Sequence, residues 1–126
     1  MRELIIKKCL SCGATVEVIE DCNCPGCGIR CCNKEMVALK PNSVDAAFEK
    51  HVPTYEVIED STIVVNVNHV MEEGHYIEWI AMASDDKVGK KFLKPGENPT
   101  VTFPYIPGSK IYAYCNKHAL WSSDVK

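Results

Sequence analysis

"YEVIEDSTIVVNVNH", residues 55–69, alternates between apolar and polar side chains, and this pattern decides the fold class of the chain. Ile63, Val65 and Val67 fall on one face of the stretch, and asparagines fall on the other. Apolar side chains at every second position are typical of a β-strand that buries one face. The stretch therefore predicts β-structure rather than helix.

Further strand candidates follow this stretch and are separated by turn motifs. HYIEWIAMA (75–83) places Ile77, Trp79 and Ala81 on one face of a predicted strand. Short strands that recur about every 8–12 residues are typical of an antiparallel sandwich or barrel, so we predict an all-β domain. The other predicted segments are the strands KKFL (90–93), TVTFPY (100–105) and KIYAYC (110–115), the turns KPGENP (94–99) and IPGS (106–109), and one helical turn, VDAAFEK (44–50).

The composition of the 126 residues, 46% hydrophobic and 25% charged, is that of a globular protein. A chain of this length forms one ordinary domain, or a small domain joined to a medium one. The net charge of −3 and the lack of a basic stripe argue against a nucleic-acid partner. The sequence has no apolar run long enough to span a bilayer, and its first apolar patch, Leu4 to Ile6, is too short for a signal peptide. We therefore expect a cytoplasmic protein that does not bind membranes.

Seven of the eight cysteines lie in the first 32 residues, and the eighth is Cys115. Two CxxCG motifs, at residues 9–13 and 24–28, each form a tight turn that can present two thiolates to one metal ion. In the reducing cytoplasm a cysteine cluster is more often metal-binding than disulfide-bonded. The cluster therefore predicts a metal site, and disulfides are the alternative, which would require an exported protein.

Cysteine density falls after Cys32, and the β pattern begins soon afterwards. The N-terminal part contains few apolar side chains, so it needs a bound metal to stay folded. We place the domain boundary near residues 36–42. The sequence predicts a small metal-bound β domain over residues 1–37 and an antiparallel β domain over residues 38–126.

The chain has four histidines, and each lies at an expected strand end or in a loop. His69 ends one β pattern and His75 begins the next, so an antiparallel pair of strands would bring both imidazoles to one end of the sheet. His118 follows Cys115 by three residues, just after a predicted strand. Because imidazole and thiolate are suited to iron, zinc or copper, these positions predict a mixed site without fixing the metal. Ordinary surface or core side chains are the alternative.

Six motifs occur in order through nearly the whole chain. They are CLSCG (9–13), CCNKEM (31–36), FEKHVP (48–53), the pair His69 and His75 before YIEWI (76–80), FLKPGENP (92–99) and YCNKHALW (114–121). This series resembles the desulfoferrodoxin family, which are the two-domain superoxide reductases. The resemblance implies an immunoglobulin-like β-sandwich preceded by a desulforedoxin-like domain.

The resemblance also implies an activity at a non-haem iron. The iron would alternate between Fe(II) and Fe(III) and reduce superoxide to hydrogen peroxide, and rubredoxin or a similar carrier would re-reduce it. This would be superoxide detoxification in the cytoplasm of an anaerobe or microaerophile. The alternative function is a non-catalytic, rubredoxin-like electron carrier or metal-binding module. The implied iron ligands are His51, His69, His75, Cys115 and His118.

Four further residues receive roles near this iron. The resemblance implies that Lys50 attracts the superoxide anion, which requires a local positive charge because the whole protein is negative. It implies that Glu49 is a sixth ligand of the oxidised iron and moves away on reduction. From the residues alone, Glu49 and Lys50 are an ordinary pair of solvated charges. We expect Asn116 to hold its loop or to tune the thiolate, and Trp121 to lie in the core.

The family pattern implies a second iron, bound by four thiolates of the N-terminal domain. The implied ligands are Cys9, Cys12, Cys31 and Cys32. This chain departs from the pattern because Cys22, Cys24 and Cys27 lie between the two pairs. The three are bystanders, or ligands of a [4Fe–4S] cluster, or the two CxxCG motifs form a rubredoxin-like or zinc-ribbon site. The family also implies a homodimer or a higher homo-oligomer.

Overall fold

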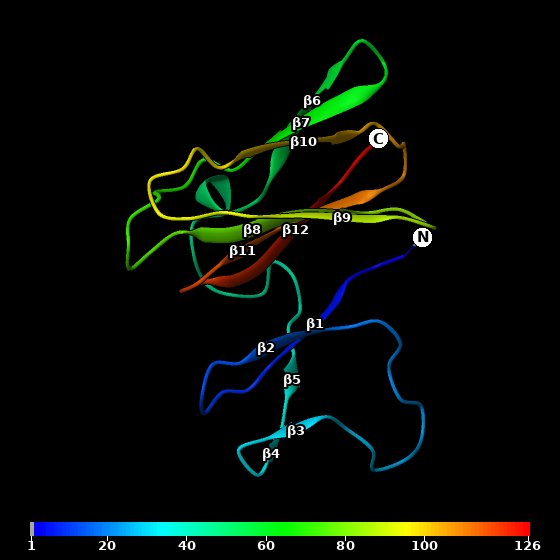
Figure 1. Cartoon of the computed structure of the whole chain (residues 1–126), viewed down its shortest axis with the longest axis vertical. Helices are drawn as coiled ribbons and strands as arrows, with labels where there is room; N and C mark the ends of the chain where they lie inside the picture. The colour runs from blue at the N-terminus through cyan, green and yellow to red at the C-terminus, as the bar shows by residue number, and fades with distance from the viewer. Residues whose placement is uncertain (1) are drawn as a thin grey trace. The chain divides into compact units, whose positions relative to one another are not determined.

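The computed structural model describes residues 2–126, which fold into two compact units (Figure 1). The smaller unit is Leu4–Lys40. The larger unit is Pro41–Lys126 together with Arg2 and Glu3. Paired strands in both units are antiparallel, which confirms the predicted all-β class.

The smaller unit contains five short strands. They are β1 (Ile5–Lys8), β2 (Thr15–Val18), β3 (Arg30–Cys31), β4 (Lys34–Glu35) and β5 (Val37–Ala38). One sheet has the order β2-β1-β5, and β3 and β4 form a hairpin. Cys32 and Asn33 make the hairpin turn with positive φ values of 53° and 61°, the conformation of a two-residue type I′ turn. Few side chains of this unit are buried, chiefly Ile6, Cys9 and Met36.

The larger unit contains seven strands after a single turn of 3-10 helix. They are η1 (Phe48–Lys50), β6 (Thr54–Ile58), β7 (Thr62–Asn66), β8 (Ile77–Ala83), β9 (Val88–Phe92), β10 (Thr100–Pro104), β11 (Lys110–Cys115) and β12 (Ala119–Asp124). One sheet has the order β10-β7-β6 and the other has the order β12-β11-β8-β9 (Figure 1). Side chains of both sheets share one core, in which Ile63 of β7 clusters with Ile80 of β8 and Ile111 of β11. The unit is therefore a β-sandwich.

The alternating stretch 55–69 forms most of the β6–β7 hairpin and the segment after it. Ile63, Val65 and Val67 are all buried in the core, as the alternation predicts. Glu59 and Asp60 have positive φ values of 52° and 58°, and the chain turns there. The stretch therefore divides into two paired strands and then runs on toward the end of the sheet.

The predicted face of β8 is wrong at one position. We expected Ile77, Trp79 and Ala81 on the same face, but Ile77 lies in the core with Ile80, while Trp79 is outside that core. The pairing of β8 with β11 shifts register at the end of β11, next to Ile77. A bulge of this kind adds one residue to a strand and so reverses the faces on its two sides.

Strand β12 is absent from the sequence-based prediction, because ALWSSD does not alternate clearly. Ala119 has a positive φ of 63°, so the chain reverses immediately after His118 and pairs back along β11. Trp121 on β12 is fully buried, as expected for a core residue. Within residues 2–126 we find no helical segment with the length and apolar character that crossing a membrane requires.

Candidate metal centres

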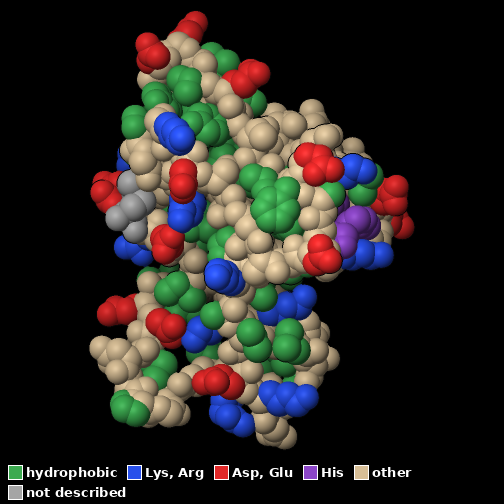
Figure 2. All heavy atoms as spheres, turned by 180° about the vertical axis from the view of Figure 1, so that it is seen from behind, with side chains coloured by type: hydrophobic (Ala, Val, Ile, Leu, Met, Phe, Trp, Pro, Cys, Tyr) green, Lys and Arg blue, Asp and Glu red, His purple; other side chains and the backbone are tan. Residues whose placement is uncertain are grey.

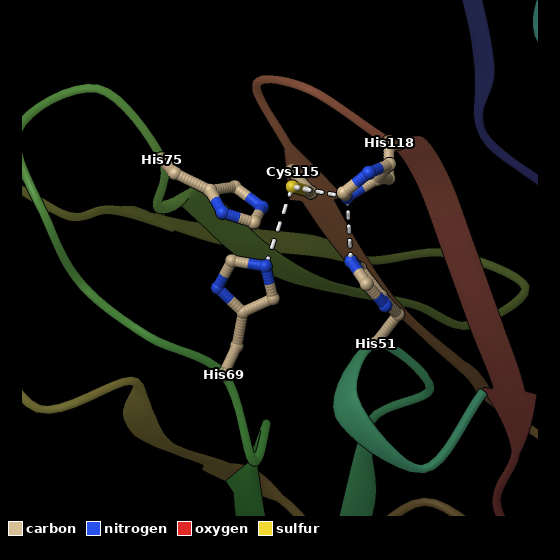
Figure 3. A group of neighbouring side chains, drawn as sticks. All are labelled: His51, His69, His75, Cys115 and His118. Carbon is tan, nitrogen blue, oxygen red and sulfur yellow. Dashed lines mark hydrogen bonds between the residues drawn. The ribbon is translucent and has the colours of Figure 1, made fainter. Parts of the chain in front are cut away.

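Five side chains that can bind a metal converge at one end of the sandwich (Figure 3). They come from distant parts of the sequence, and each lies at the end of a strand or in a loop. His69 lies in the loop after β7 and His75 in the loop before β8, so one connection supplies two imidazoles. This connection crosses from one sheet to the other, and the expected antiparallel pairing of these two strands is wrong. The full set is His51 after η1, His69, His75, Cys115 at the end of β11 and His118 before β12. The structure therefore brings together all five residues predicted for the catalytic iron.

The donor atoms of this group, one from each residue, all lie within 4.8 Å of one another. The Cys115 Sγ lies 3.4 Å from the His69 Nε2 and 3.7 Å from the His118 Nδ1. The His51 Nε2 lies 3.0 Å from the His118 Nδ1. Four imidazoles and one thiolate form a donor set suited to iron, zinc or copper, and this set has the compactness of a single-ion site.

Two observations on the imidazoles support a metal at this position. The Nε2 of His75 is buried and has no hydrogen-bond partner among residues 2–126. A bound metal ion would satisfy this nitrogen by accepting its lone pair. The Nδ1 of His51 lies 2.7 Å from the carbonyl oxygen of Ala47, so Nδ1 can carry the proton and donate a hydrogen bond to this oxygen. The lone pair of Nε2 is then available to bind a metal ion. Hydrogen bonding of one ring nitrogen to a carbonyl is the usual arrangement of metal-binding histidines.

The electrostatics of the group favour the neutral forms of His69 and His118. Burial lowers the pKa of His69 and of His118, and the neighbouring imidazoles lower both further. Burial raises the pKa of the Cys115 thiol, although the backbone N–H groups of Lys117 and His118 oppose this effect. Because a metal ion must displace the thiol proton, metal binding at this group will release a proton and weaken as the pH falls.

Trp121 supports two of the five side chains. Its ring stacks on the His51 ring with a centroid separation of 4.8 Å and an interplanar angle of 27°. Its Nε1–H donates a hydrogen bond of 2.8 Å to the carbonyl oxygen of His118. Phe48 also packs edge-on against Trp121, with 5.2 Å between the ring centroids. The sequence analysis placed Trp121 in the core but did not detect this supporting role.

Asn116 joins the two loops that provide His75 and Cys115. Its side-chain oxygen accepts a hydrogen bond of 2.9 Å from the backbone N–H of Tyr76, and its Nδ2 donates one of 3.1 Å to the carbonyl oxygen of Gly74. Of the two roles expected for Asn116, the structure shows the loop-holding role.

Substitution of Asn116 with Ala should weaken metal binding at this group. The variant loses both side-chain hydrogen bonds of Asn116 and keeps the backbone hydrogen bond of 3.2 Å from its N–H to the carbonyl oxygen of Tyr76. Loss of such supporting contacts typically costs about 10–100-fold in metal affinity. Metal titration of the metal-depleted protein measures the change, with Asn68→Ala, an exposed asparagine of the same unit, as the matched control. An unchanged affinity in Asn116→Ala would show that the loops hold their positions without this side chain.

The two charged residues predicted near the iron lie on the exposed turn before His51. Glu49 and Lys50 belong to η1, and both side chains are exposed. Neither belongs to the compact five-residue group within the described chain, residues 2–126. Lys117 is a further exposed cation that the sequence analysis did not single out, and its charge acts on both Cys115 and His118. Figure 2 shows a histidine patch that reaches the surface beside basic and acidic side chains.

A second compact group lies in the smaller unit and consists of thiols. Its four sulfur atoms lie within 4.8 Å of one another, and the Sγ atoms of Cys12 and Cys31 are 3.6 Å apart. Backbone N–H groups of Cys12 and Ser11 lower the pKa of the Cys9 thiol to about 6. The neighbouring thiols of Cys12 and Cys9 raise the pKa of Cys31 to about 12. Four thiolates this close require a cation, so the group fits a tetrahedral iron or zinc ion. The members are Cys9, Cys12, Cys31 and Cys32.

The three other N-terminal cysteines lie outside this group. Cys22 and Cys27 form a disulfide, and Cys24 is a free, exposed thiol. The alternative site built from the two CxxCG motifs is therefore not the arrangement within residues 2–126, because the second motif takes part in a disulfide instead. The disulfide alternative therefore applies to this one pair. Contrary to the sequence analysis, one such pair does not by itself require export, because cytoplasmic proteins can carry transient, redox-active disulfides.

The comparisons with known proteins agree with this geometry. The family model described as Desulfoferrodoxin matches residues 43–124. The desulfoferrodoxins of Syntrophotalea carbinolica and Desulfarculus baarsii are each 44% identical to this chain over 126 residues, and these matches cover 97% and 96% of both sequences, respectively. The structure also resembles the crystal structure of the superoxide reductase from Treponema pallidum, with a TM-score of 0.72 and 28% sequence identity, over 98% of this chain and all of that one. The match over nearly the full length confirms the family predicted from the sequence motifs, and the chain belongs to the desulfoferrodoxin family.

Proposed function

We propose that this chain is a superoxide reductase, which converts superoxide, one electron and two protons into hydrogen peroxide. The observation that supports this proposal most is the convergence of four imidazoles and one thiol within 4.8 Å at the end of the sandwich. A protein of 28% identity and the same fold over the full length is a superoxide reductase. We assign His51, His69, His75, Cys115 and His118 as the ligands of one iron.

Iron at this position would supply the chemistry by alternating between Fe(II) and Fe(III), one electron at a time. The chain's own residues would set the conditions for that transfer. The neutral imidazoles hold the ion without adding charge, and the Cys115 thiolate donates electron density to it. Cys115 is fully buried, so its sulfur is shielded from competing oxidants.

Lys50 and Glu49 receive separate roles in this proposal. We assign Lys50 to the attraction of the superoxide anion, because it is an exposed cation directly before the ligand His51. Lys117 would add to the local positive field. We assign Glu49 as an additional ligand of the oxidised iron, since its carboxylate is on an exposed turn that can move without breaking a strand.

The four-thiol group would hold a second iron in a desulforedoxin-like domain, residues 1–37 in our assignment, ahead of the catalytic domain, residues 38–126. A [4Fe–4S] cluster and a zinc ion are the alternatives. The ratio of iron to acid-labile sulfide in anaerobically purified protein separates these cases. Electrons would come from rubredoxin or a similar carrier, in a cytoplasmic homodimer or higher homo-oligomer that detoxifies superoxide in an anaerobe.

The competing function is an electron carrier that uses only the four-thiol group. Measuring superoxide consumption by the reduced protein distinguishes it from the proposed enzyme. The reduced protein should consume superoxide and form one hydrogen peroxide per superoxide without evolving O2. An electron carrier alone would not consume superoxide faster than the metal-free protein does. Evolution of O2 would instead indicate dismutation and contradict the proposal.

Replacement of Lys50 with Ala should slow the second-order reaction with superoxide by roughly tenfold to a hundredfold, within the range that local charge focusing contributes. The remaining rate should depend less on ionic strength, because salt screens the attraction that the variant has lost. Pulse radiolysis over a series of salt concentrations measures both effects.

Lys87→Ala is the matched control for this variant. Both substitutions make the net charge more negative by one unit. Lys87 lies in the turn after β8, whereas His75 lies just before β8. Because a strand rises by a little over 3 Å per residue, the two ends of β8, and so these two residues, are about 20 Å apart. Equal rates for Lys50→Ala and Lys87→Ala would show that only the whole-molecule charge matters and would remove Lys50 from the proposed mechanism.

A further inference from the structure

Cys22, Cys24 and Cys27 lie within six residues of one another in the sequence, and neither metal group uses them. Cys22 and Cys27 are joined by a disulfide, and Cys24 is a free thiol between them. Cys22 and Cys24 are exposed, and Cys27 is partly exposed. Exposed disulfides are the ones most open to reduction and exchange, in contrast to buried structural disulfides.

The backbone also places the free thiol within reach of the disulfide. The segment Cys24-Pro25-Gly26-Cys27 is a β-turn, in which the N–H of Cys27 donates a hydrogen bond of 3.3 Å to the carbonyl oxygen of Cys24. Gly26 has a φ of +72°, and a proline followed by such a glycine is the pattern of a type II turn. The first and last Cα atoms of a β-turn are less than about 7 Å apart, which overlaps the span of a disulfide. Cys27 therefore has two possible partners.

The loop is also fixed at its C-terminal end. The N–H of Met36 donates a hydrogen bond of 2.7 Å to the carbonyl oxygen of Ile29. The backbone at Gly28 lies against the carboxylate of Glu35, so closely that a Cβ there would overlap it. The loop that carries the three cysteines is thus held at its C-terminal end by the hydrogen bond between Ile29 and Met36, which lie on either side of the β3–β4 hairpin.

We propose that Cys22, Cys24 and Cys27 form a thiol–disulfide exchange site, with Cys27 as the shared partner. In the exchange, the Cys24 thiolate attacks the Cys27 sulfur, the Cys24–Cys27 bond forms, and Cys22 leaves as a thiolate. No net oxidation occurs in this step. The site accepts two electrons and two protons from a dithiol, which becomes a disulfide, and is left with three free thiols.

The oxidant that restores the disulfide is a peroxide. One thiolate is oxidised to a sulfenic acid with release of water, and a second thiol condenses with it to give the disulfide and another water. Hydrogen peroxide is one such oxidant, and it is also the product of the proposed function. The exchange itself does not rest on that function, because any peroxide would serve.

The test uses the full chain with its metals in place. The protein is reduced with dithiothreitol, desalted, treated with hydrogen peroxide, quenched in acid and alkylated. Tandem mass spectrometry then identifies which of the three cysteines are linked. The wild-type chain should give a mixture of Cys22–Cys27 and Cys24–Cys27 species, and dithiothreitol should abolish both.

The three serine variants control for one another. Cys24→Ser should give only the Cys22–Cys27 linkage, and Cys22→Ser should give only the Cys24–Cys27 linkage. Cys27→Ser should lose both. The visible spectrum of the metals shows in each case that the smaller unit remains assembled, so loss of a linkage is not confused with unfolding.

Three outcomes would overturn the proposal. Three free thiols after peroxide treatment would show that no redox couple exists. In a parallel sample of the reduced protein alkylated at neutral pH without the acid step, thiols that resist alkylation until a chelator is added would show that the three bind a metal instead. A wild-type chain that forms only the Cys22–Cys27 linkage would show that Cys24 takes no part. None of these readouts depends on superoxide consumption, so the proposed function can stand or fail separately.

Discussion

Cys115→Ser should abolish the reduction of superoxide while the sandwich remains folded. Loss of a supporting hydrogen bond around a metal typically costs about 10–100-fold, and loss of the thiolate ligand itself should cost more. The substitution also removes the group that donates electron density to the iron. Pulse radiolysis gives the rate constant, and the visible spectrum of the oxidised protein should lose the charge-transfer absorption that arises from Cys115, while any absorption of the four-thiol group remains.

The variant buries a hydroxyl, so its stability needs a separate control. Ala113→Ser provides one, because Ala113 lies two residues earlier on β11, in the same core, and is also fully buried. Thermal unfolding of the two variants should change by similar amounts, whereas only Cys115→Ser should lose activity. If Cys115→Ser consumes superoxide at the wild-type rate, the proposal of an enzyme acting at this centre is wrong.

The positions of the histidines could be predicted because β alternation has clear ends. The apolar pattern that stops at Val67 and resumes at Ile77 leaves His69 and His75 in the connection between two strands. The two strands do not form the antiparallel pair that the sequence analysis assumed, because β7 and β8 lie in different sheets, but the connection between them still carries both imidazoles to the site. The spacing of three residues placed His118 beside Cys115, but for His51 the residues alone indicated only a loop, and the family resemblance was needed to connect it with the others.

The local geometry around the site could not be predicted in the same way. The bulge that turns Ile77 into the core depends on how β8 pairs with β11, a contact between residues almost forty positions apart. The stacking of Trp121 on His51 is likewise a contact between residues far apart in the sequence. Alternation reports which side chains are buried, but it does not report which neighbours they meet.

The cysteine cluster illustrates the limit of spacing arguments. A CxxCG motif predicts a turn with two nearby thiols, and Cys24 and Cys27 do lie across such a turn. Whether a second pair faces that turn depends on the path of the intervening chain. Here Cys31 and Cys32, on the β3–β4 hairpin, approach Cys9 and Cys12 instead.

The sparse core of the smaller unit leads to the second large expected effect, which is unfolding of residues Leu4–Lys40 when their metal is lost. Only Ile6, Cys9 and Met36 are buried apolar side chains there. A metal held by four thiolates can contribute on the order of 10 kcal/mol to the folding of so small a unit. Cys9→Ser should therefore lose the metal and unfold this unit, while residues 41–126 stay folded.

Hydrogen exchange followed by mass spectrometry distinguishes the two units. In Cys9→Ser the amides of β1, β2 and β5 should exchange at the rate of an unfolded chain, and those of β7, β8 and β11 should stay protected. Ser11→Ala is the matched control, because it removes an exposed side chain next to Cys9 but keeps the backbone N–H that lowers the pKa of that thiol. Full protection of β1 in Cys9→Ser would mean that the Cys22–Cys27 disulfide and the small core suffice, and that the four-thiol group is not what holds this unit together.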